Sequence, residues 1–438
     1  MKRLTADQPV AEPHIRECAG CGLLQAVPAL RPGMTAQCTR CRTVLHRTTA
    51  HPITHSMALA AAGLVLLAIL SLTPLMTVQT AGIQLTAGLF DGPAELVRRG
   101  MTLLALVVVF VVVVAPLAKL AGTLYVLVRL HEGQPPRHLR RVFAIVERLR
   151  PWSMIEVFVF GVFVAYVKLG DLVQITLDVG VYVLLALTVV LVWSDSAMDR
   201  DAIWDRLGGQ AQEPLPSARL LQWLPGRAIG CETCGFINAA HGSHGRCRRC
   251  DSVLHRRKPN SVARTWALLL AAAVLYVPAN YFPVLTVMQL GAGAPSTILG
   301  GVEELVSSGM YPLAALVFFA SIAVPMLKMI GMTIMLVTTQ TSSPGQLVGR
   351  TWLYHVVCWV GRWSMIDIFM EALLGALVRF GTVITIEPGI GAVAFCAVVI
   401  LTMLAAESFD PRLMWDAAEQ RKKEAETPGD GTRAQPAD

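Results

Sequence analysis

Cys18-Ala-Gly-Cys21, Cys38-Thr-Arg-Cys41 and Val44-Leu-His-Arg47 open this chain, and the pattern returns as Cys231-Glu-Thr-Cys234, Cys247-Arg-Arg-Cys250 and Val253-Leu-His-Arg256. The second copy follows at an offset of 209 residues, counted from Cys38 to Cys247. A solenoid unit repeats every ~20–50 residues, so this spacing indicates something larger. We interpret the chain as a duplicated module, in which a four-cysteine segment precedes an apolar domain. Many membrane transporters are built from internal repeats of this kind.

The repeat continues through the apolar domains. Pro74-Leu-Met-Thr-Val78 returns as Pro283-Val-Leu-Thr-Val287, and Pro116-Leu-Ala-Lys119 returns as Pro325-Met-Leu-Lys328. Trp152-Ser-Met-Ile-Glu156 returns, two residues further on, as Trp363-Ser-Met-Ile-Asp367. The two apolar domains are therefore predicted to share one architecture.

The composition is that of a membrane protein. Of 438 residues, 54% are hydrophobic and 15% are charged, and the mean hydropathy is +0.55. An ordinary globular domain carries about 25% charged residues. A helix needs roughly 17–25 apolar residues to cross a hydrocarbon core of about 30 Å. We predict an all-α polytopic protein with eight spans, four per module, at 57–78, 101–128, 152–169, 177–193, 266–287, 310–337, 363–380 and 390–408.

The distribution of basic residues predicts the orientation of the spans. Lys and Arg gather in 129–150, in 194–265 and in the C-terminal tail, whereas 288–309 and 381–389 have none. Basic loops stay on the cytosolic side, so we expect both termini and both cysteine segments in the cytosol. No signal peptide is visible before the first span. The net charge of +7 belongs to juxtamembrane loops, which argues against nucleic acid as a partner.

The predicted domains follow from these boundaries. They are an N-terminal tail (1–14), ribbon 1 (15–50), transmembrane module 1 (51–205), a linker (206–226), ribbon 2 (227–259), transmembrane module 2 (260–416) and a disordered cytosolic tail (417–438).

The paired CxxC motifs predict two metal centres. Sixteen residues separate the pairs in the first set and twelve in the second, which leaves room for short strands. Each CxxC places two sulfurs on one turn, and two turns complete a tetrahedral four-thiolate zinc site. Thiol redox chemistry is the weaker interpretation in a reducing cytosol, and iron is not excluded as the metal. The predicted ligands of two structural zinc ions are Cys18, Cys21, Cys38, Cys41, Cys231, Cys234, Cys247 and Cys250.

Ionisable residues inside the predicted spans are the second candidate site. Such residues are costly in lipid and call for a structural or functional reason. Lys119 and Glu156 lie at similar depth in module 1, as do Lys328 and Asp367 in module 2, so the sequence predicts one Lys–carboxylate pair per module. Ser153 and Ser364 lie near them on the third spans. A salt bridge that pins two helices is one interpretation, and a polar cavity or a proton- or force-coupling network is the other, favoured for module 2. Pro116 and Pro325 predict kinks in the second spans.

Several functions are not supported by the sequence. It contains no G-x-x-x-x-G-K-[ST] nucleotide-binding loop. A closed four-thiolate shell leaves no open coordination position for zinc catalysis. No nucleophile–base constellation stands out either, so we expect a protein that is not an enzyme.

The motifs together resemble the paraquat-inducible protein A (PqiA/LetA) family. The resemblance rests on tandem four-cysteine ribbons that each lead a four-span domain, on Pro-x-x-Thr-Val and on the repeated Trp-Ser-Met-Ile-acid. The closing Ser408-Phe-Asp410-Pro-Arg412-Leu-Met-Trp415-Asp416 is also similar to the family. The resemblance to the family covers about residues 15–416. Module 2 fits better, because module 1 lacks an equivalent of Asn280 before its proline.

The resemblance implies a function that the residues alone do not give. It implies an inner-membrane component of intermembrane lipid transport, which passes lipid to or from a tunnel formed by a periplasmic MCE (mammalian cell entry) protein. It also implies a tetraspanin-like four-helix bundle in each module, with the ribbons joining the two bundles on the cytosolic side. Two alternatives remain open: a membrane anchor or assembly scaffold for the MCE partner, and a cytosol-facing metal or redox sensor.

Overall fold

A computed structural model describes most of the 438 residues. The described residues are 14–28, 30–49, 52–80, 83–133, 136–170, 174–208, 228–239, 245–289, 292–377 and 384–426.

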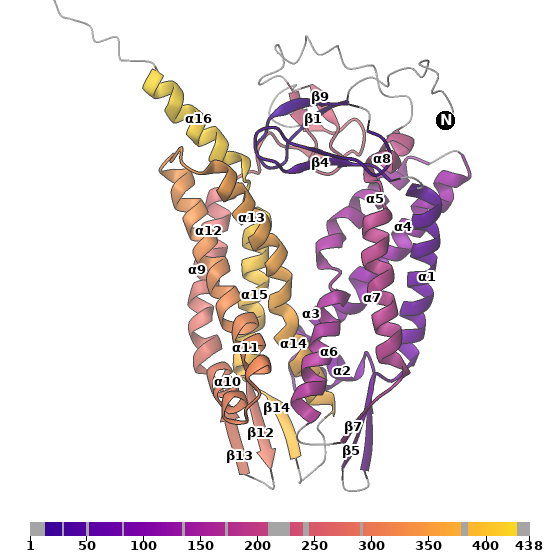
Figure 1. Ribbon diagram of the computed structural model, residues 1–438, viewed down its shortest axis with the longest axis vertical. Coiled ribbons are helices and arrows are strands. Elements are labelled where there is room, and N and C mark those ends of the chain that lie inside the picture. Colours follow the sequence, from indigo (N-terminus) through magenta and orange to yellow (C-terminus); the bar gives the residue numbers. More distant parts are fainter. Residues whose placement is uncertain are drawn as a thin grey trace, which may run out of the picture.

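Two helical bundles stand side by side, with the ribbons at one end and small β-sheets at the opposite end (Figure 1). The helices of module 1 are α1 (Pro52–Leu72), α2 (Asp91–Arg98), α3 (Thr102–Val109), α4 (Ala115–His131), α5 (His138–Leu149), α6 (Ile155–Gly170), α7 (Val179–Ala197) and α8 (Arg200–Gly208). Those of module 2 are α9 (Ser261–Tyr281), α10 (Ile298–Ser307), α11 (Tyr311–Phe318), α12 (Val324–Gln340), α13 (Leu347–Gly361), α14 (Ile366–Leu377), α15 (Ile390–Ser408) and α16 (Arg412–Glu426). The predicted two-module organisation corresponds to this arrangement.

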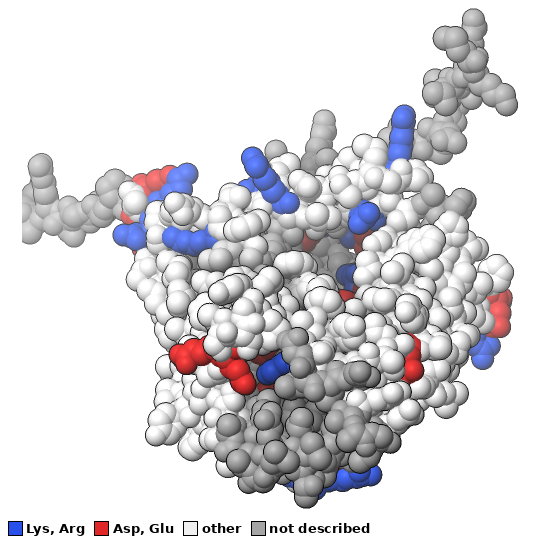
Figure 2. Space-filling model, turned by 60° about the horizontal axis from the view of Figure 1, so that its bottom comes forward, with Lys and Arg blue, Asp and Glu red and all other residues white. Residues whose placement is uncertain are grey.

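The described part of the chain contains seven helical segments that are long and apolar enough to cross a membrane. They are 53–72, 102–131, 138–170, 179–197, 261–281, 311–340 and 390–408. The remaining predicted span, 363–380, corresponds to α14, which is described as a helix as far as Leu377. Charged side chains are sparse over much of the described surface in Figure 2. The chain is therefore a multi-pass membrane protein.

Each module carries a three-stranded antiparallel sheet that the sequence analysis did not predict. In module 1, β5 (Met76–Thr80) pairs with β6 (Ile83–Ala87) and β7 (Gln174–Leu177). In module 2, β12 (Leu285–Gln289) pairs with β13 (Ala292–Ser296) and β14 (Ile384–Pro388). The repeated Pro-x-x-Thr-Val motif marks the start of the central strand. The first span was predicted to run to residue 78, which is wrong, since α1 ends before Pro74 and β-branched residues follow.

A glycine at the start of each fourth span fits tightly against this sheet region. A Cβ atom at Gly180 would lie 2.3 Å from the carbonyl oxygen of Pro74. At Gly391, the equivalent position of the repeat, it would lie 2.6 Å from the carbonyl oxygen of Phe282 and 2.9 Å from that of Pro283. No side chain larger than hydrogen fits there without a backbone shift, so the repeat preserves both the proline and the glycine that it contacts.

The two prolines of the second spans follow a turn of π-helix rather than a simple kink. Phe110–Val114 precedes α4 and Phe319–Ala323 precedes α12, and both segments are π-helical. A helical proline lacks an N–H and crowds the carbonyl four residues earlier. For Pro325 that carbonyl belongs to Ser321, inside the wider turn. The π-turn thus accommodates the proline, and such turns are frequent at functional sites.

Both ribbons are β-rich, as predicted. Each is built from two antiparallel hairpins, one for each CxxC turn. The strands are β1 (His14–Glu17), β2 (Leu24–Val27), β3 (Thr35–Gln37), β4 (Val44–Arg47), β8 (Ala228–Gly230), β9 (Ile237–Ala239), β10 (Gly245–Arg246) and β11 (Val253–Leu254).

Ribbon 1 packs on module 2, although it precedes module 1 in the chain. Its four cysteines share one buried cluster with side chains of α12, α13 and α16, among them Met332, Val357 and Trp415. The guanidinium of Arg40 lies over the Trp415 ring, 4.5 Å from its centroid. Thr43 is hydrogen-bonded to His355 at 3.3 Å. The first ribbon is therefore anchored on the second bundle.

Ribbon 2 makes the reciprocal contact with module 1. Its cysteines share a buried cluster with side chains of α4, α5 and α8, including Val126, Phe143 and Trp204. Arg249 donates to the carbonyl oxygen of Trp204 at 3.0 Å. Arg249 is the repeat equivalent of Arg40 at the offset of 209 residues, so the two ribbons dock by equivalent surfaces in a crossed arrangement.

The two bundles also meet directly, through α6 and α14. A Cβ atom at Gly161 would lie 2.8 Å from the Cβ of Phe369, which shows how closely the helices cross. Phe158 and Phe369 stack edge to face at 5.5 Å. A small residue at such a crossing allows close helix packing within a membrane.

The C-terminal tail corrects one prediction. Residues 417–426 were predicted to be disordered, but α16 extends through Glu426. This segment is rich in Ala, Glu and Lys, which are strong helix formers, and Lys423 pairs with Glu419 at 3.5 Å one turn away. The rest of the predicted tail lies outside the described residues.

The crossed arrangement makes a directional prediction. Cys38→Ser should raise backbone hydrogen exchange in α13 and α16 of module 2, because ribbon 1 covers them. Cys247→Ser should instead raise exchange in α5 and α8 of module 1. Hydrogen–deuterium exchange with mass spectrometry on the purified protein measures both. Each variant serves as the control for the other, and loss of protection in the module that directly follows the altered ribbon would contradict crossed docking.

Candidate metal centres and a charged pocket

The four CxxC turns have the same backbone. In each, the residue after the second cysteine has a positive φ: Gly22 at 73°, Arg42 at 63°, Gly235 at 68° and Asp251 at 60°. Its N–H donates to the carbonyl oxygen of the first cysteine at 2.8–2.9 Å. Glycine adopts this conformation without strain, so the turn explains Gly22 and Gly235. Arg42 and Asp251 occupy equivalent positions of the two ribbons at some conformational cost.

The sulfur geometry of both clusters fits a tetrahedral metal. The Cys18–Cys41 and Cys21–Cys38 sulfurs are 3.4 and 3.6 Å apart, and the Cys231–Cys250 and Cys234–Cys247 sulfurs are both 3.5 Å apart. Zn–S bonds of about 2.3 Å at tetrahedral angles place sulfurs roughly 3.8 Å apart. All eight cysteines are free and buried. The structure therefore brings together all eight predicted ligands as two groups capable of holding metal ions.

His46 lies outside the thiolate cluster. Its Nδ1 contacts the carboxylate of Asp201 at the start of α8, and Arg16 pairs with the same carboxylate at 2.8 Å. Asp199 lies beside them and caps the N–H of Ala202. Burial would raise the pKa of Asp201, but the hydrogen bond from His46 and the charge of Arg16 lower it below its usual value. This ion-pair network ties ribbon 1 to module 1 as well.

Arg412 connects both ribbons to module 2. Its guanidinium, 4% exposed, pairs with Asp410 at 2.9 Å, with Glu17 of ribbon 1 at 3.3 Å and with Glu232 of ribbon 2 at 2.5 Å. Burial would raise the pKa of Asp410, but its hydrogen bonds and charge pairing with Arg412 lower it. This stabilisation is present above the unfolded pKa of about 4 and is lost only as the pH falls through the folded value. Asp410 and Arg412 are thus both charged at neutral pH.

The charged residues of module 1 pair differently from the prediction. Lys119 lies 2.8 Å from Asp195 at the end of α7, and Glu156 lies 3.1 Å from Arg362 of the other module. The predicted Lys119–Glu156 pair is therefore wrong. Asp195 was missed because it follows the predicted fourth span, which ended at residue 193. Ser153 is buried close to this region in the loop before α6.

Module 2 lacks the equivalent of Asp195. At the two-residue drift of the repeat, this position is Ala406. Lys328, 2% exposed, donates to the carbonyl oxygen of Gly361 at 3.4 Å. Among the described residues no carboxylate lies within 4 Å of its amine, so the predicted pair with Asp367 is not formed. The buried Ser364 hydroxyl and Asp367 Oδ1 have no hydrogen-bond partner.

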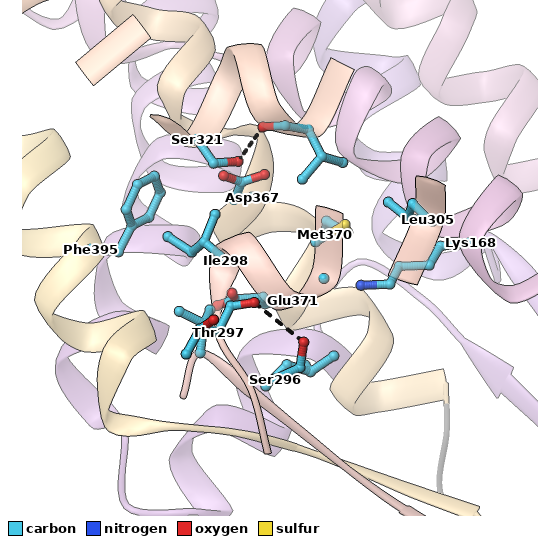
Figure 3. A pocket seen from close by; sticks show the side chains of 14 residues that line it. Lys168, Ser296, Thr297, Ile298, Leu305, Ser321, Asp367, Met370, Glu371 and Phe395 are labelled. Carbon is cyan, nitrogen blue, oxygen red and sulfur yellow. Dashed lines mark hydrogen bonds between the residues drawn. The ribbon is translucent and has the colours of Figure 1, made fainter. Parts of the chain in front are cut away.

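Asp367 instead lines a small pocket at the sheet end of module 2 (Figure 3). Asp367 and Glu371 enter it from α14, and Ser321 enters from the π-helical turn. Lys168 reaches it from α6 of module 1. The remaining wall is largely apolar and includes Ile298, Leu305, Met370 and Phe395. The pocket thus combines apolar walls with buried charge.

Sequence reasoning missed Glu371 and Lys168. Glu371 carries a detectable signal, because it lies four residues after Asp367 on the same helix face. No sequence pattern identifies Lys168, since its role depends on how the two modules pack against each other. The repeat equivalents of Glu371 and Ser321 in module 1 are Phe160 and Val112, so the duplicated bundle has no comparable set of polar groups.

The fold and sites together define a class: a two-module membrane protein with paired four-cysteine clusters and a charged pocket in its described part. The family model for paraquat-inducible protein A matches residues 53–208 and 262–419. The chain belongs to this family.

Curated relatives match along nearly the whole chain. Intermembrane transport protein PqiA of Escherichia coli (strain K12) is 34% identical over 411 residues, which is 93% of this chain and 97% of that protein. Lipophilic envelope-spanning tunnel protein A of the same strain is 31% identical over 404 residues, 92% of each. A probable intermembrane transport protein of Haemophilus influenzae is 29% identical over 421 residues, 93% of this chain and 97% of that protein. No solved structure matches this chain.

The metal centres predict a specific loss. Cys231→Ser should remove one of two bound metal ions and lower protein abundance, because metal binding supplies folding free energy to small thiolate domains. Elemental analysis of the purified protein gives metal per chain. Cys358→Ser is the control, since Cys358 belongs to neither quartet, and it should retain both ions. Two ions and normal abundance in Cys231→Ser would show that ribbon 2 does not depend on a metal.

Proposed function

We propose that this protein is an integral inner-membrane component of an intermembrane lipid transport system, which passes lipid to or from a periplasmic MCE-protein tunnel. The pocket of module 2 carries this proposal, because it combines apolar walls with buried polar groups at the end remote from the ribbons. Lipids are amphipathic and need both surfaces. The names of the relatives, intermembrane transport and envelope-spanning tunnel proteins, support the same conclusion.

The proposed topology has eight spans, with α14 as part of the seventh, and two tetraspanin-like bundles whose sheet ends face the periplasm. The two ribbons would then hold two structural zinc ions in the cytosol. The basic residues near the ribbon end support this orientation. A periplasmic MCE partner would meet the sheet end, where the pocket lies.

Cysteine labelling tests the orientation. Arg98 and Arg246 are both exposed, with 70% and 67% of their side chains accessible, at the sheet end and in ribbon 2 respectively. Arg98→Cys should react with a membrane-impermeant thiol reagent in spheroplasts, whereas Arg246→Cys should react only after lysis. The opposite pattern would invert the topology.

Along module 2, Lys328, Ser364 and Asp367 are the proposed transport network. They are buried and incompletely paired, and Asp367 connects them to the pocket. Burying a charge without a partner is costly, so retaining such groups favours a working site over a helix-pinning salt bridge. Lys119, Ser153 and Glu156 of module 1 have a structural role in this proposal, since Lys119 and Glu156 are paired.

Neutralising Asp367 separates transport from scaffolding. Asp367→Asn should keep normal abundance and still co-purify with the MCE protein, yet restore the outer-membrane barrier at least about tenfold less well than the unaltered protein, as expected for one lost charged contact. Glu156→Gln, the repeat-equivalent change, should behave like the unaltered protein. Full barrier function with Asp367→Asn would favour the anchor or scaffold, and absence of an MCE protein from the purified complex would contradict the partnership.

A further inference from the structure

The pocket of module 2 contains more negative than positive charge. Asp367 and Glu371 are 6% and 3% exposed and lie one helical turn apart on α14. Like charges at this spacing repel each other, and burial increases the cost. Asp367 Oδ1 accepts no hydrogen bond within the described structure. The two carboxylates therefore present an unsatisfied site for a cation that donates hydrogen bonds.

Among the described residues that line the pocket, Lys168 is the one basic residue, and it comes from the other module. Figure 3 shows its amine entering from the right of the view, at about the height of Glu371 and below Asp367. Within the described residues it makes no ion pair at 4 Å or less. The ammonium of Lys168 therefore does not fully compensate the charges of Asp367 and Glu371. It remains available to an anion.

The start of α10 adds a second anion-binding element. Thr297 caps the helix by accepting a hydrogen bond from the N–H of Gly300 at 3.1 Å, and both Ser296 and Thr297 line the pocket. The first turn of this ten-residue helix has no acidic residue that would offset its positive end. Backbone N–H groups and the dipole at a helix N-terminus favour phosphate.

We propose that this pocket selects phospholipids with a zwitterionic primary-amine head group, the phosphoethanolamine class. The ammonium lies against Asp367 and Glu371, and the phosphate lies against Lys168 and the start of α10. The apolar wall of Leu285, Leu305 and Phe395 receives the first part of an acyl chain. This inference rests on the proposed lipid transport and adds the class of lipid.

Two common alternatives fit the same charges less well. A phosphocholine carries a quaternary ammonium, which donates no N–H hydrogen bond to a carboxylate and is bulkier. A phosphoglycerol brings no cation, so its negative charge leaves the two acids uncompensated. Hydrogen bonds between charged partners are stronger than neutral ones, and each missing charged bond corresponds to roughly a tenfold loss of affinity.

Competitive lipid capture tests the selection. The purified full-length protein in detergent is mixed with equimolar phosphatidylethanolamine, phosphatidylcholine and phosphatidylglycerol of matched chains, and bound lipid is measured by native mass spectrometry. We expect about tenfold enrichment of phosphatidylethanolamine over each competitor. Glu371→Gln and Asp367→Asn should abolish the enrichment, and Lys168→Met should reduce binding of all three lipids.

Asp178→Asn is the matched control, because Asp178 bonds Thr77 in module 1 and lies outside the pocket. It should keep the enrichment. Metal content and elution volume establish that each variant is folded. Equal binding of the three lipids to the unaltered protein would overturn the head-group inference and leave lipid transport standing. Absence of any bound phospholipid would overturn both. Enrichment that persists in all three pocket variants would overturn the head-group inference for this pocket alone.

Discussion

The structure depends on the docking of each four-cysteine ribbon on the bundle that does not directly follow it in the chain. Ribbon 1 is tied to module 1 by the chain and to module 2 by contacts such as Arg40 with Trp415. Ribbon 2 makes the equivalent contacts in reverse, through Arg249 and Trp204. Ribbons this small have little core of their own, so a metal would supply most of their folding free energy. The crossing therefore makes the joint between the bundles depend on two thiolate clusters.

At the ribbon end, the contacts that hold the two bundles together involve equivalent positions of the repeat but different residue types. Asp201 and Arg412 occupy equivalent positions of the two modules, and both contact ribbon 1. Arg412 also reaches ribbon 2 through Glu232. Because its charge is buried among carboxylates from both ribbons and its own module, the three parts are fixed in one register.

The sequence predicted the parts that repeat and missed the parts that depend on contact between repeats. CxxC spacing specifies a metal shell locally, so the sequence predicted which eight cysteines come together in the two clusters. The short sheets were missed because Thr77 and Val78 continue an apolar run that reads as helix. The Lys119–Glu156 pair failed because depth in the membrane does not fix which helix lies opposite. No sequence pattern indicated a role for Lys168, since only the packing of α6 on α14 brings it to Asp367.

Duplication followed by divergence explains why module 1 does not repeat, among its described residues, the polar side chains that line the charged pocket of module 2. The bundle that replaces Ser321 and Glu371 with Val112 and Phe160 fills the equivalent positions with apolar side chains. It also satisfies its buried lysine with Asp195, which the other bundle lacks. Buried charge without a partner is costly. Module 1 pairs its buried lysine and supplies Lys168, whereas module 2 retains the unsatisfied carboxylates. A site made from two diverged copies needs both in fixed register, and the crossed ribbons impose that constraint from the far end.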